Sequence, residues 1–347
     1  MPMPPNQNKQ LRLCWATESI ALAKPFKISR GTKTHAEVIV LAISIGDAKG
    51  WAEAVPYARY NESIASTNSI LEKVEAILLA FEYPSSLALV EYAQAYVTEN
   101  LPASSAKNLL DCALWDLKAS ITHTSVNRLL KLKEVTQLVS AQTLSVDSIE
   151  LMLANAKDMS HLPLIKIKLD AVDIVVKMQA IHQVCPNSKF IIDANEAWSF
   201  DILQDVVASL ASLNVALIEQ PLPAGQDDEL ILFTSPIPLC ADESCHTSAD
   251  ITVLATKYNM VNIKLDKTGG LSEALALANA AKAAELQIML GCMVASSLAM
   301  APIFILAEYA NFVDLDGPVL VAIDRDNGFE FTGAVMQKPT NLLWGQG

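Results

Sequence analysis

The sequence predicts an α/β protein in which a parallel barrel of eight strands follows a smaller α+β domain. From about Val139 onward, short apolar runs rich in β-branched residues alternate with helical segments. One residue near the C-terminal end of each run lies 25, 25, 26, 23, 22, 27 and 23 positions from the next, which is the length of one βα unit. Such strands form a parallel sheet covered by helices, and eight of them close most readily into a barrel. A doubly wound open sheet is the alternative.

Each of the eight expected strands corresponds to one apolar run. In chain order the runs are VSAQTLSV (139–146), LIKIKLD (164–170), KFIIDAN (189–195), ALIEQP (216–221), PLCADES (238–244), MVNIKLD (260–266), QIMLGCM (287–293) and FVDLDGP (312–318).

The two ends of the chain have a different residue pattern from the repeated strand and helix units. We expect a strand over Glu37–Ile45, a loop over Tyr57–Ser63 and an amphipathic helix over Ala106–Ala119. From about Val321 the pattern is typical of turns and short strands. The expected organisation is therefore an α+β domain over 1–120, a barrel over 121–320 and a C-terminal segment, 321–347, that returns to the first domain.

Composition and charge exclude several classes of protein. The 347 residues are 52% hydrophobic and 18% charged, as in a globular chain. The formal net charge is 25 − 38 = −13 without a basic run, so nucleic acid is not an expected partner. No apolar stretch reaches the ~20 residues of a membrane helix, and the N-terminus lacks a signal-peptide pattern, so we expect a cytoplasmic protein. Six scattered cysteines are expected to be free thiols.

Carboxylates end three successive expected strands. Asp193, Glu219 and Asp242 lie at the C-terminal ends of their runs, where the loops of a barrel open to solvent and active sites are built. Three acids converging at the barrel mouth would repel one another unless a cation neutralised them. An all-oxygen set favours Mg²⁺, one per subunit, with Mn²⁺ as a substitute. For each acid alone, a helix N-cap or a surface ion pair is the alternative.

Two lysines flank these acids along the chain. Lys168 ends the run before them and Lys264 the run after them, so their ammonium groups are expected to face each other across the mouth. One lysine would remove a proton from the carbon next to a carboxylate while the other delivers a proton to the opposite face, which inverts the stereocentre. Lys166, on the same strand face as Lys168, would help to stabilise the enediolate. For Lys267 a solvated position at the rim is expected.

Asp314 and Asp316 lie on one face of the last expected strand, outside the three-acid cluster. Two carboxylates in this position would suit an ammonium group, and the alternative is a strand-terminating turn.

Two further patterns have simpler explanations. Gly269 and Gly270 either bind an anion at a helix N-terminus or form a tight turn. Cys240, Cys245 and His246 are not expected to bind zinc, because Cys240 should point into the packed strand.

Taken together, these motifs resemble the enolase superfamily and, within it, the muconate-lactonizing subgroup. KIK (166–168), IDAN (192–195), IEQP (218–221), ADES (241–244) and NIK (262–264) fall in that family's order and spacing, over nearly the whole chain. The resemblance implies a modified (β/α)7β barrel under an α+β capping domain, with loops near 25–35 and 55–63 covering the substrate and setting specificity.

Finer motifs resemble dipeptide epimerases. The AspXAsp pair is similar to theirs, and CADESCHT (240–247), NIKLDKTGGL (262–271) and GCM (291–293) resemble bacterial L-Ala-D/L-Glu epimerases. The implied reaction is a Mg²⁺-dependent 1,1-proton transfer at the α-carbon of the C-terminal residue of a dipeptide, converting L-Ala-D-Glu into L-Ala-L-Glu in the recycling of cell-wall peptides. The implied partner is a small dipeptide, without nucleic acid or membrane, and the chain acts alone or as a homo-oligomer.

The resemblance also implies roles for single residues. Asp314 and Asp316 would hold the free α-ammonium group, and Arg30 or Arg59 would pair with the glutamate side-chain carboxylate. Further residues expected at the site are Asn195 and Glu243 beside the metal ligands, and Thr143, Cys292 and Met293 against the substrate. Many relatives carry a glutamate after GCM where this chain has Val294 and Ala295, so contacts from the seventh loop differ.

Other functions remain open at this point. The same lysine pair serves o-succinylbenzoate synthesis, N-succinylamino acid racemisation and cycloisomerisation in the subgroup. A barrel without catalytic activity, kept for binding, is the alternative from another class. The complete set of acids and both lysines argue against it.

Overall fold

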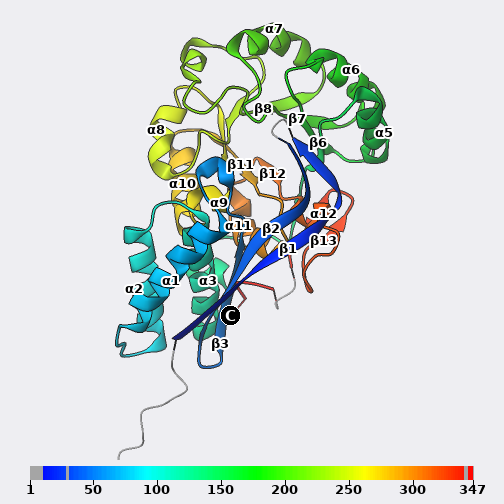
Figure 1. The fold of residues 1–347 in the computed structure, drawn as a ribbon. Coiled ribbons are helices and arrows are strands. Elements are labelled where there is room, and N and C mark those ends of the chain that lie inside the picture. Colours follow the sequence, from blue (N-terminus) through cyan, green and yellow to red (C-terminus); the bar gives the residue numbers. More distant parts are fainter. Residues whose placement is uncertain (1–10, 29–30, 340–342, 347) are drawn as a thin grey trace, which may run out of the picture.

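The computed structural model describes residues 11–28, 31–339 and 343–346. Within these ranges the chain forms an N-terminal unit of one antiparallel sheet with helices, an eight-stranded parallel barrel and a small C-terminal sheet (Figure 1). Arg30, proposed above as a substrate contact, lies outside the described residues.

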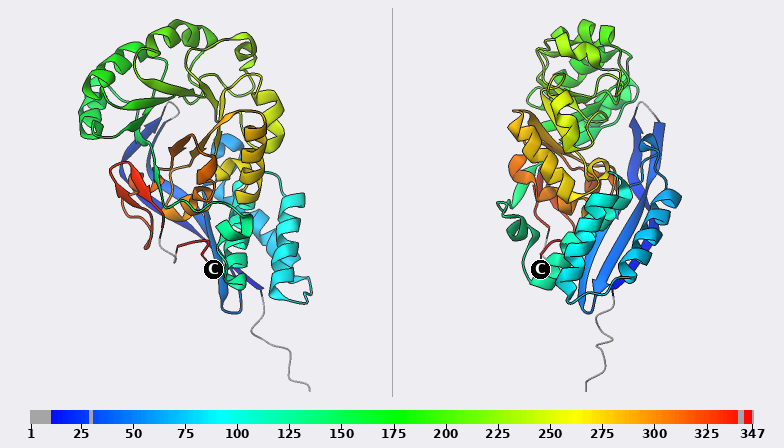
Figure 2. Two further views of the ribbon diagram at one scale, coloured as in Figure 1. Left: turned by 180° about the vertical axis from the view of Figure 1, so that it is seen from behind. Right: turned by 90° about the vertical axis from the view of Figure 1, so that its left-hand side faces the viewer.

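The N-terminal sheet has the antiparallel order β1-β2-β3, with β1 Leu11–Ile28, β2 Gly31–Ile45 and β3 Ala48–Ala54. Two helices, α1 Ile64–Leu79 and α3 Ser105–Thr122, pack against it, and α2 Ser86–Asn100 packs on α3 (Figure 2). The expected strand and helix correspond to β2 and α3. We did not predict β1, because only its first residues alternate between buried and exposed, and beyond Trp15 it has no buried side chain.

Close packing of α3 on β3 depends on Gly50. A Cβ atom added at this position would lie 2.1 Å from the carbonyl oxygen of Ala113 and 2.4 Å from the amide nitrogen of Leu117. The Ser104 side chain caps the helix by accepting a hydrogen bond from the Lys107 amide (3.3 Å). The helix therefore packs closely on the N-terminal sheet.

The predicted eight-stranded parallel barrel is confirmed. Its strands are β5 Gln142–Leu144, β6 Leu164–Lys168, β7 Lys189–Asp193, β8 Val215–Glu219, β9 Leu239–Ala241, β10 Met260–Ile263, β11 Gln287–Gly291 and β12 Phe312–Asp314, paired in chain order. The Ala141 amide donates to the Val313 carbonyl (2.8 Å) and joins the first strand to the last. This contact excludes the open sheet.

Helices cover the outside of the barrel. They are α5 Ile149–Met159, α6 Ile174–Val184, α7 Phe200–Leu210, α8 Ile251–Leu254, α10 Leu271–Ala283 and α11 Ser297–Phe304. The short helix α9 Leu265–Thr268 instead lies buried at the end of β10 and contacts α3 of the N-terminal unit. After β8 the chain forms only a 3-10 helix, η3 Asp228–Leu232, instead of an α-helix.

The C-terminal segment contacts both units. It follows α12 Gly317–Leu320 and contains β13 Glu330–Thr332 and β14 Val335–Gln337, and β14 pairs with β4 Gln137–Val139 just before the barrel. Near the end, the Trp344 indole donates to the Trp51 carbonyl (3.0 Å), and the Gly345 amide donates to Asp116 on α3 (2.6 Å).

Gly269 and Gly270 form a turn, and the anion at the following helix is the protein's own. Both glycines have positive φ angles (78° and 112°) and separate α9 from α10. Asp111 of α3 accepts from the Ser272 amide (2.9 Å), and a Cβ at Gly270 would lie 2.6 Å from this carboxylate. The N-terminus of α10 therefore binds the N-terminal unit.

Two sequence-based expectations concern the molecule as a whole. The six cysteines are free thiols. Among the described helices, none combines the length and the apolar character that a membrane crossing requires.

Candidate functional site

The barrel strands present their interior side chains in layers. The lowest layer is a separate apolar cluster of one residue from each of seven strand regions, namely Ala141, Leu164, Ile191, Leu217, Cys240, Met260 and Met289, with Phe312 packed against it. Residues two positions further along a strand point the same way. The next layer is therefore polar and consists of Thr143, Lys166, Asp193, Glu219, Asp242, Asn262 and Asp314, with Gly291 completing it.

A cavity of about 620 Å³ lies above the polar layer, between the barrel and the N-terminal unit. On the barrel side its lining includes Lys168, Lys264 and Asp316. On the other side it is lined by the ends of β1 and β2 and by the segment that contains Tyr57 and Tyr60. Described residues of both loops expected to cover the substrate thus line the cavity.

Lys166 lies at the centre of the acidic cluster. Its Nζ is 2.9 Å from Asp193 Oδ2, 2.6 Å from Glu219 Oε2 and 2.7 Å from Asp314 Oδ2. Because this ammonium group is buried, the three carboxylates stabilise its charge in place of water.

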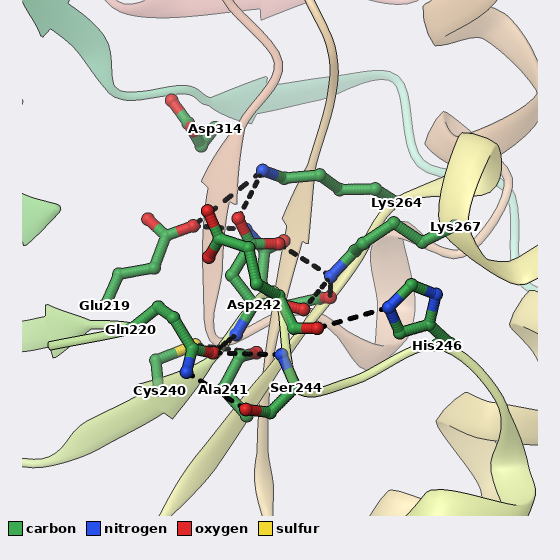
Figure 3. A network of polar contacts seen from close by, with 12 residues as sticks. Glu219, Gln220, Cys240, Ala241, Asp242, Ser244, His246, Lys264, Lys267 and Asp314 are labelled. Carbon is green, nitrogen blue, oxygen red and sulfur yellow. Dashed lines mark hydrogen bonds and ion pairs between the residues drawn. The ribbon is translucent and has the colours of Figure 1, made fainter. Parts of the chain in front are cut away.

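The two lysines expected to act as acid and base also contact the predicted metal ligands. Lys168 Nζ is 2.6 Å from Asp193 Oδ2. Lys264 Nζ is 2.7 Å from Asp242 Oδ2 and 3.9 Å from Glu219 Oε1 (Figure 3). Their side chains belong to β6 and to the residue after β10, strands that are four places apart in the eight-stranded order. In a barrel such strands are opposite each other, so the lysines approach the cavity from opposite sides.

Burial and charge set the protonation of this cluster. Burial and the neighbouring Asp193 charge raise the pKa of Glu219 to about 8, against the opposing effect of Lys166. Burial also raises the pKa of Asp193 and Asp242, but the ammonium groups around them outweigh it and hold both values below the ordinary range. For Lys264, burial lowers the pKa, and Asp242 and Glu219 outweigh this and raise it. Lys264 is therefore in the form that delivers a proton.

The residues present fit a hard divalent cation. Asp193, Glu219 and Asp242 offer only oxygen, as Mg²⁺ prefers. Glu219 Oε2 is buried and forms an ion pair with Lys166, but it accepts no hydrogen bond in the described part of the chain. Since lysine side chains lie between the acids, no group of three acids, cysteines or histidines among the described residues converges on one point.

The AspXAsp pair lies at the cavity wall, and its two members differ in their partners. Asp314 Oδ2 accepts from Lys166, whereas Asp316 Oδ2 accepts from the Thr143 amide (2.7 Å). Burial and the Asp314 charge raise the pKa of Asp316 to about 7. The strand-terminating turn is also present, because α12 begins directly after Asp316.

Two family descriptions match most of the chain. Residues 12–131 match the mandelate racemase / muconate lactonizing enzyme N-terminal domain, and residues 151–324 match the enolase C-terminal domain-like family. The chain belongs to the enolase superfamily. The family resemblance inferred from KIK, IDAN, IEQP, ADES and NIK is thereby confirmed.

Two curated relatives are named for their action on glutamate derivatives. The chain is 47% identical to an N-acetyl-D-glutamate racemase from Pseudoalteromonas sp over 308 residues, which cover 89% of this chain and 95% of the relative. It is 40% identical to the L-Ala-D/L-Glu epimerase of Escherichia coli (strain K12) over 91% of this chain and 96% of the relative. Both relatives are isomerases.

Solved structures of dipeptide epimerases have the same fold. An enolase family member from Agrobacterium tumefaciens with homology to dipeptide epimerases, solved with sodium and L-Ala-L-Glu, has a TM-score of 0.90 at 38% identity, covering 96% of this chain and 100% of that one. A dipeptide epimerase from Methylococcus capsulatus, complexed with Mg and L-Arg-D-Lys, has a TM-score of 0.87 at 25% identity, covering 98% and 99%.

The structure places the remaining residues that were expected at the site in different positions. Cys292, Met293 and Asn195 line the cavity, and the Asn195 side chain donates to Glu243 Oε1 (3.5 Å). Arg59, the second candidate for the distal carboxylate, donates two hydrogen bonds to Glu196 (2.9 and 2.7 Å), while its neighbours Ala58 and Tyr60 line the cavity. Arg59 belongs to the expected covering loop 55–63, and Glu196 of the neighbouring barrel loop is its partner in this structure.

Sequence reasoning missed three residues around the predicted ligands. Lys267 is not at a solvated rim, because it is 1% exposed and bonded to Asp242. Asn262 donates to Glu219, and Gln220 Oε1 accepts from the amide of Asp242 (2.9 Å). Asn262 precedes Lys264 by two positions, so strand alternation alone could have identified it.

Proposed function

We propose that this chain is a Mg²⁺-dependent dipeptide epimerase that interconverts L-Ala-D-Glu and L-Ala-L-Glu by moving the α-proton of the glutamate residue. The observation that carries the proposal is the placement of Lys168 and Lys264 on opposite sides of one cavity that Asp314 and Asp316 also line. The relatives that act on glutamate derivatives support the same substrate class.

The two lysines divide the proton transfer between the two faces of the α-carbon. The lysine on one side accepts the α-proton in its neutral form, and the ammonium group on the other side delivers a proton to the opposite face. Because the delivered proton arrives from the other side, the configuration inverts. In the reverse reaction the two lysines exchange roles. One forward and one reverse turnover therefore return each lysine to its original protonation state.

The intermediate between the two transfers is an enediolate, which carries additional negative charge on the substrate carboxylate. Lys166 lines the cavity and supplies a fixed positive charge next to that position. Mg²⁺ held by Asp193, Glu219 and Asp242 would supply further positive charge as a Lewis acid. Asp314 and Asp316 would bind the α-ammonium group of the alanyl residue, and the glutamate side-chain carboxylate would lie against the cations of the covering loops, including Arg30.

A second candidate is racemisation of N-acetylglutamate. The reacting carbon is the same, and only the N-acyl group differs, because an acetyl group has no ammonium. The pKa of Asp316, raised to about 7, favours this alternative, since a protonated carboxyl needs no cationic partner. The same argument applies to N-succinylamino acids.

The experiment that tests the proposal is proton NMR in D₂O with enzyme and Mg²⁺. The substrates compared are L-Ala-D-Glu, L-Ala-L-Glu and N-acetyl-D-glutamate. For each, the loss of the α-proton signal and the appearance of signals from the other stereoisomer are measured. Fast interconversion of the two dipeptides with exchange is expected. Preference for N-acetyl-D-glutamate would establish the second candidate, and absence of exchange in all three would refute both.

The wider setting follows from this substrate and stays a prediction. L-Ala-D-Glu as substrate would place the enzyme in the reuse of cell-wall peptides in the cytoplasm, either as single chains or as a homo-oligomer. A deletion strain that accumulates L-Ala-D-Glu would support this role.

A further inference from the structure

In each of the three predicted metal ligands, the two carboxylate oxygens have different kinds of partner. On each carboxylate, one oxygen accepts a hydrogen bond from a donor other than the cavity-lining lysines. These donors are the Asn195 amide for Asp193 Oδ1 (2.9 Å), Asn262 Nδ2 for Glu219 Oε1 (2.7 Å) and Lys267 Nζ for Asp242 Oδ1 (2.6 Å). The other oxygens, Asp193 Oδ2, Glu219 Oε2 and Asp242 Oδ2, contact Lys166, Lys168 or Lys264.

Lys267 is the unusual donor in this set, because it is a charged side chain that lies almost entirely out of solvent. All three of its N–H groups have acceptors: the carbonyl of Asp242 (2.5 Å), Oδ1 of Asp242 (2.6 Å) and the carbonyl of Asn262 (3.0 Å). Figure 3 shows the ammonium group beside Asp242. Lys267 therefore joins Asp242, the residue after β9, to Asn262 of β10, and the Asn262 side chain in turn binds Glu219.

A comparison with Lys264 indicates that the two lysines have different tasks. Among the described residues, the ion-pair partners of Lys264 are the carboxylates of Asp242 and Glu219, and Lys264 lines the cavity. Lys267 does not line the cavity, and two of its three acceptors are backbone carbonyls, which keep their position when side chains move. Lys264 is thus placed to reach a substrate, whereas Lys267 is held on the protein backbone.

The space around Asn262 is equally restricted. A Cβ atom at Gly291 of the neighbouring strand would lie 2.4 Å from Asn262 Oδ1, so glycine at this position leaves room for the amide. The backbone carbonyl of Asn262 binds Lys267 while its side chain binds Glu219. Asp242 and Glu219 are thereby oriented by one connected unit.

We propose that Lys267 and Asn262 are positioning residues that fix one oxygen of Asp242 and one of Glu219, so that the other oxygen of each is presented to the divalent cation. The inference rests on the metal site of the proposed function. It predicts that the pair controls metal affinity without touching the substrate. Partners of this kind, which orient ligands, typically change metal affinity by about 10- to 100-fold when mutated.

The test is the affinity of the full-length, metal-stripped protein for Mn²⁺, measured by calorimetry and by the EPR signal of free Mn²⁺, without substrate. Lys267→Met and Asn262→Ser are compared with wild type. Lys177→Met is the matched control, because Lys177 is also buried (7% exposed) and bonded to a carboxylate, Asp170 (2.9 Å), but on the outer helix α6. Melting temperatures in chelator report the purely structural effect of each substitution.

We expect Mn²⁺ binding about 10-fold or more weaker in Lys267→Met and in Asn262→Ser, and unchanged in Lys177→Met. Affinity within twofold of wild type in either folded variant of the pair would overturn the proposal. If Lys267→Met does not fold, Asn262→Ser decides alone, since it leaves the buried ammonium group paired.

The result is separable from the proposed reaction. Wild type that binds Mn²⁺ and depends on the pair, but does not epimerise dipeptides, would refute the reaction and keep this inference. Wild type that binds no Mn²⁺ would overturn the inference, whatever activity the NMR experiment finds.

Discussion

Arg59 and Glu196 form a bidentate ion pair between the N-terminal unit and the barrel. Nε and Nη2 of Arg59 donate to the two carboxylate oxygens at 2.9 and 2.7 Å. Glu196 Oε1 also accepts from the Ala224 amide (2.9 Å), so the contact extends from the loop after β7 to the loop after β8. Because Arg59 lies between Ala58 and Tyr60, which line the cavity, the pair holds the covering segment over the barrel mouth.

Arg59→Ala should therefore weaken substrate binding without regard to the side chain of the substrate. Arg59 is partly exposed, and ion pairs of this kind contribute up to about 1 kcal/mol, so we expect KM to rise about three- to fivefold with little change in kcat. The measurement compares L-Ala-D-Glu with the neutral analogue L-Ala-D-Gln, and Glu196→Gln is the matched variant. A defect confined to L-Ala-D-Glu would instead place Arg59 on the distal carboxylate.

Lys168→Ala and Lys264→Ala should each abolish interconversion of the dipeptides. Loss of a positioned acid or base typically costs about 10² to 10⁴ in rate, and here every turnover needs both lysines. Each variant retains the base for one face, so in D₂O it should still exchange the α-proton of one diastereomer, and the two variants should select opposite diastereomers. Interconversion that survives in both variants would rule out the two-lysine mechanism.

Asp316→Asn should separate the two candidate substrates. The amide oxygen can still accept from Thr143, so the local fold is retained, but the charge that an ammonium group requires is lost. Since hydrogen bonds to charged groups contribute about 1.5–3 kcal/mol, kcat/KM for L-Ala-D-Glu should fall at least 10-fold. For N-acetyl-D-glutamate the change should stay within about threefold, because that substrate offers no ammonium to this carboxylate. Equal losses for both substrates would mean that Asp316 does not bind an ammonium group.

Asp116 should make the protein more stable as the pH falls from 7 to 5. Burial raises its pKa to about 6, although the amides of Gly345 and Trp51 lower it in part. The folded state thus binds a proton below pH 6, whereas the unfolded state binds one only near pH 4. The contribution of protonated Asp116 to stability is fully present below the pKa that this group has in the unfolded chain, and it is lost as the pH rises through about 6.

The comparison of wild type with Asp116→Asn by urea unfolding at pH 5 and pH 7 isolates this contribution. From pH 7 to pH 5, the free energy of unfolding of wild type should rise by about 1.4 kcal/mol relative to that of the variant, which corresponds to one pKa unit. Asp111, whose pKa is also about 6, is present in both proteins and cancels. A difference between the two proteins that does not depend on pH would contradict the prediction.

Much of the fold and of the site could be predicted because both depend on short-range periodicity. The spacing of about one βα unit predicts the barrel, and the position of Asp193, Glu219 and Asp242 at strand ends predicts that they gather at its mouth. Lys168 and Lys264 follow from the same argument. Strand β1 escaped prediction because only Leu11 and Leu13 are buried, so most of the strand lacks an alternation of fully buried and exposed side chains and is held by its pairing with β2.

The sequence by itself determined which residues enter the barrel mouth, because strand alternation and the βα repeat are local properties of the chain. Only the tertiary structure decided which charges meet there. Arg59 was a candidate for the substrate and binds Glu196, 137 positions away, and Lys267 was expected in solvent and is buried against Asp242. Charge pairing depends on distance in space, and a sequence pattern does not specify which of several carboxylates lies nearest to an ammonium group.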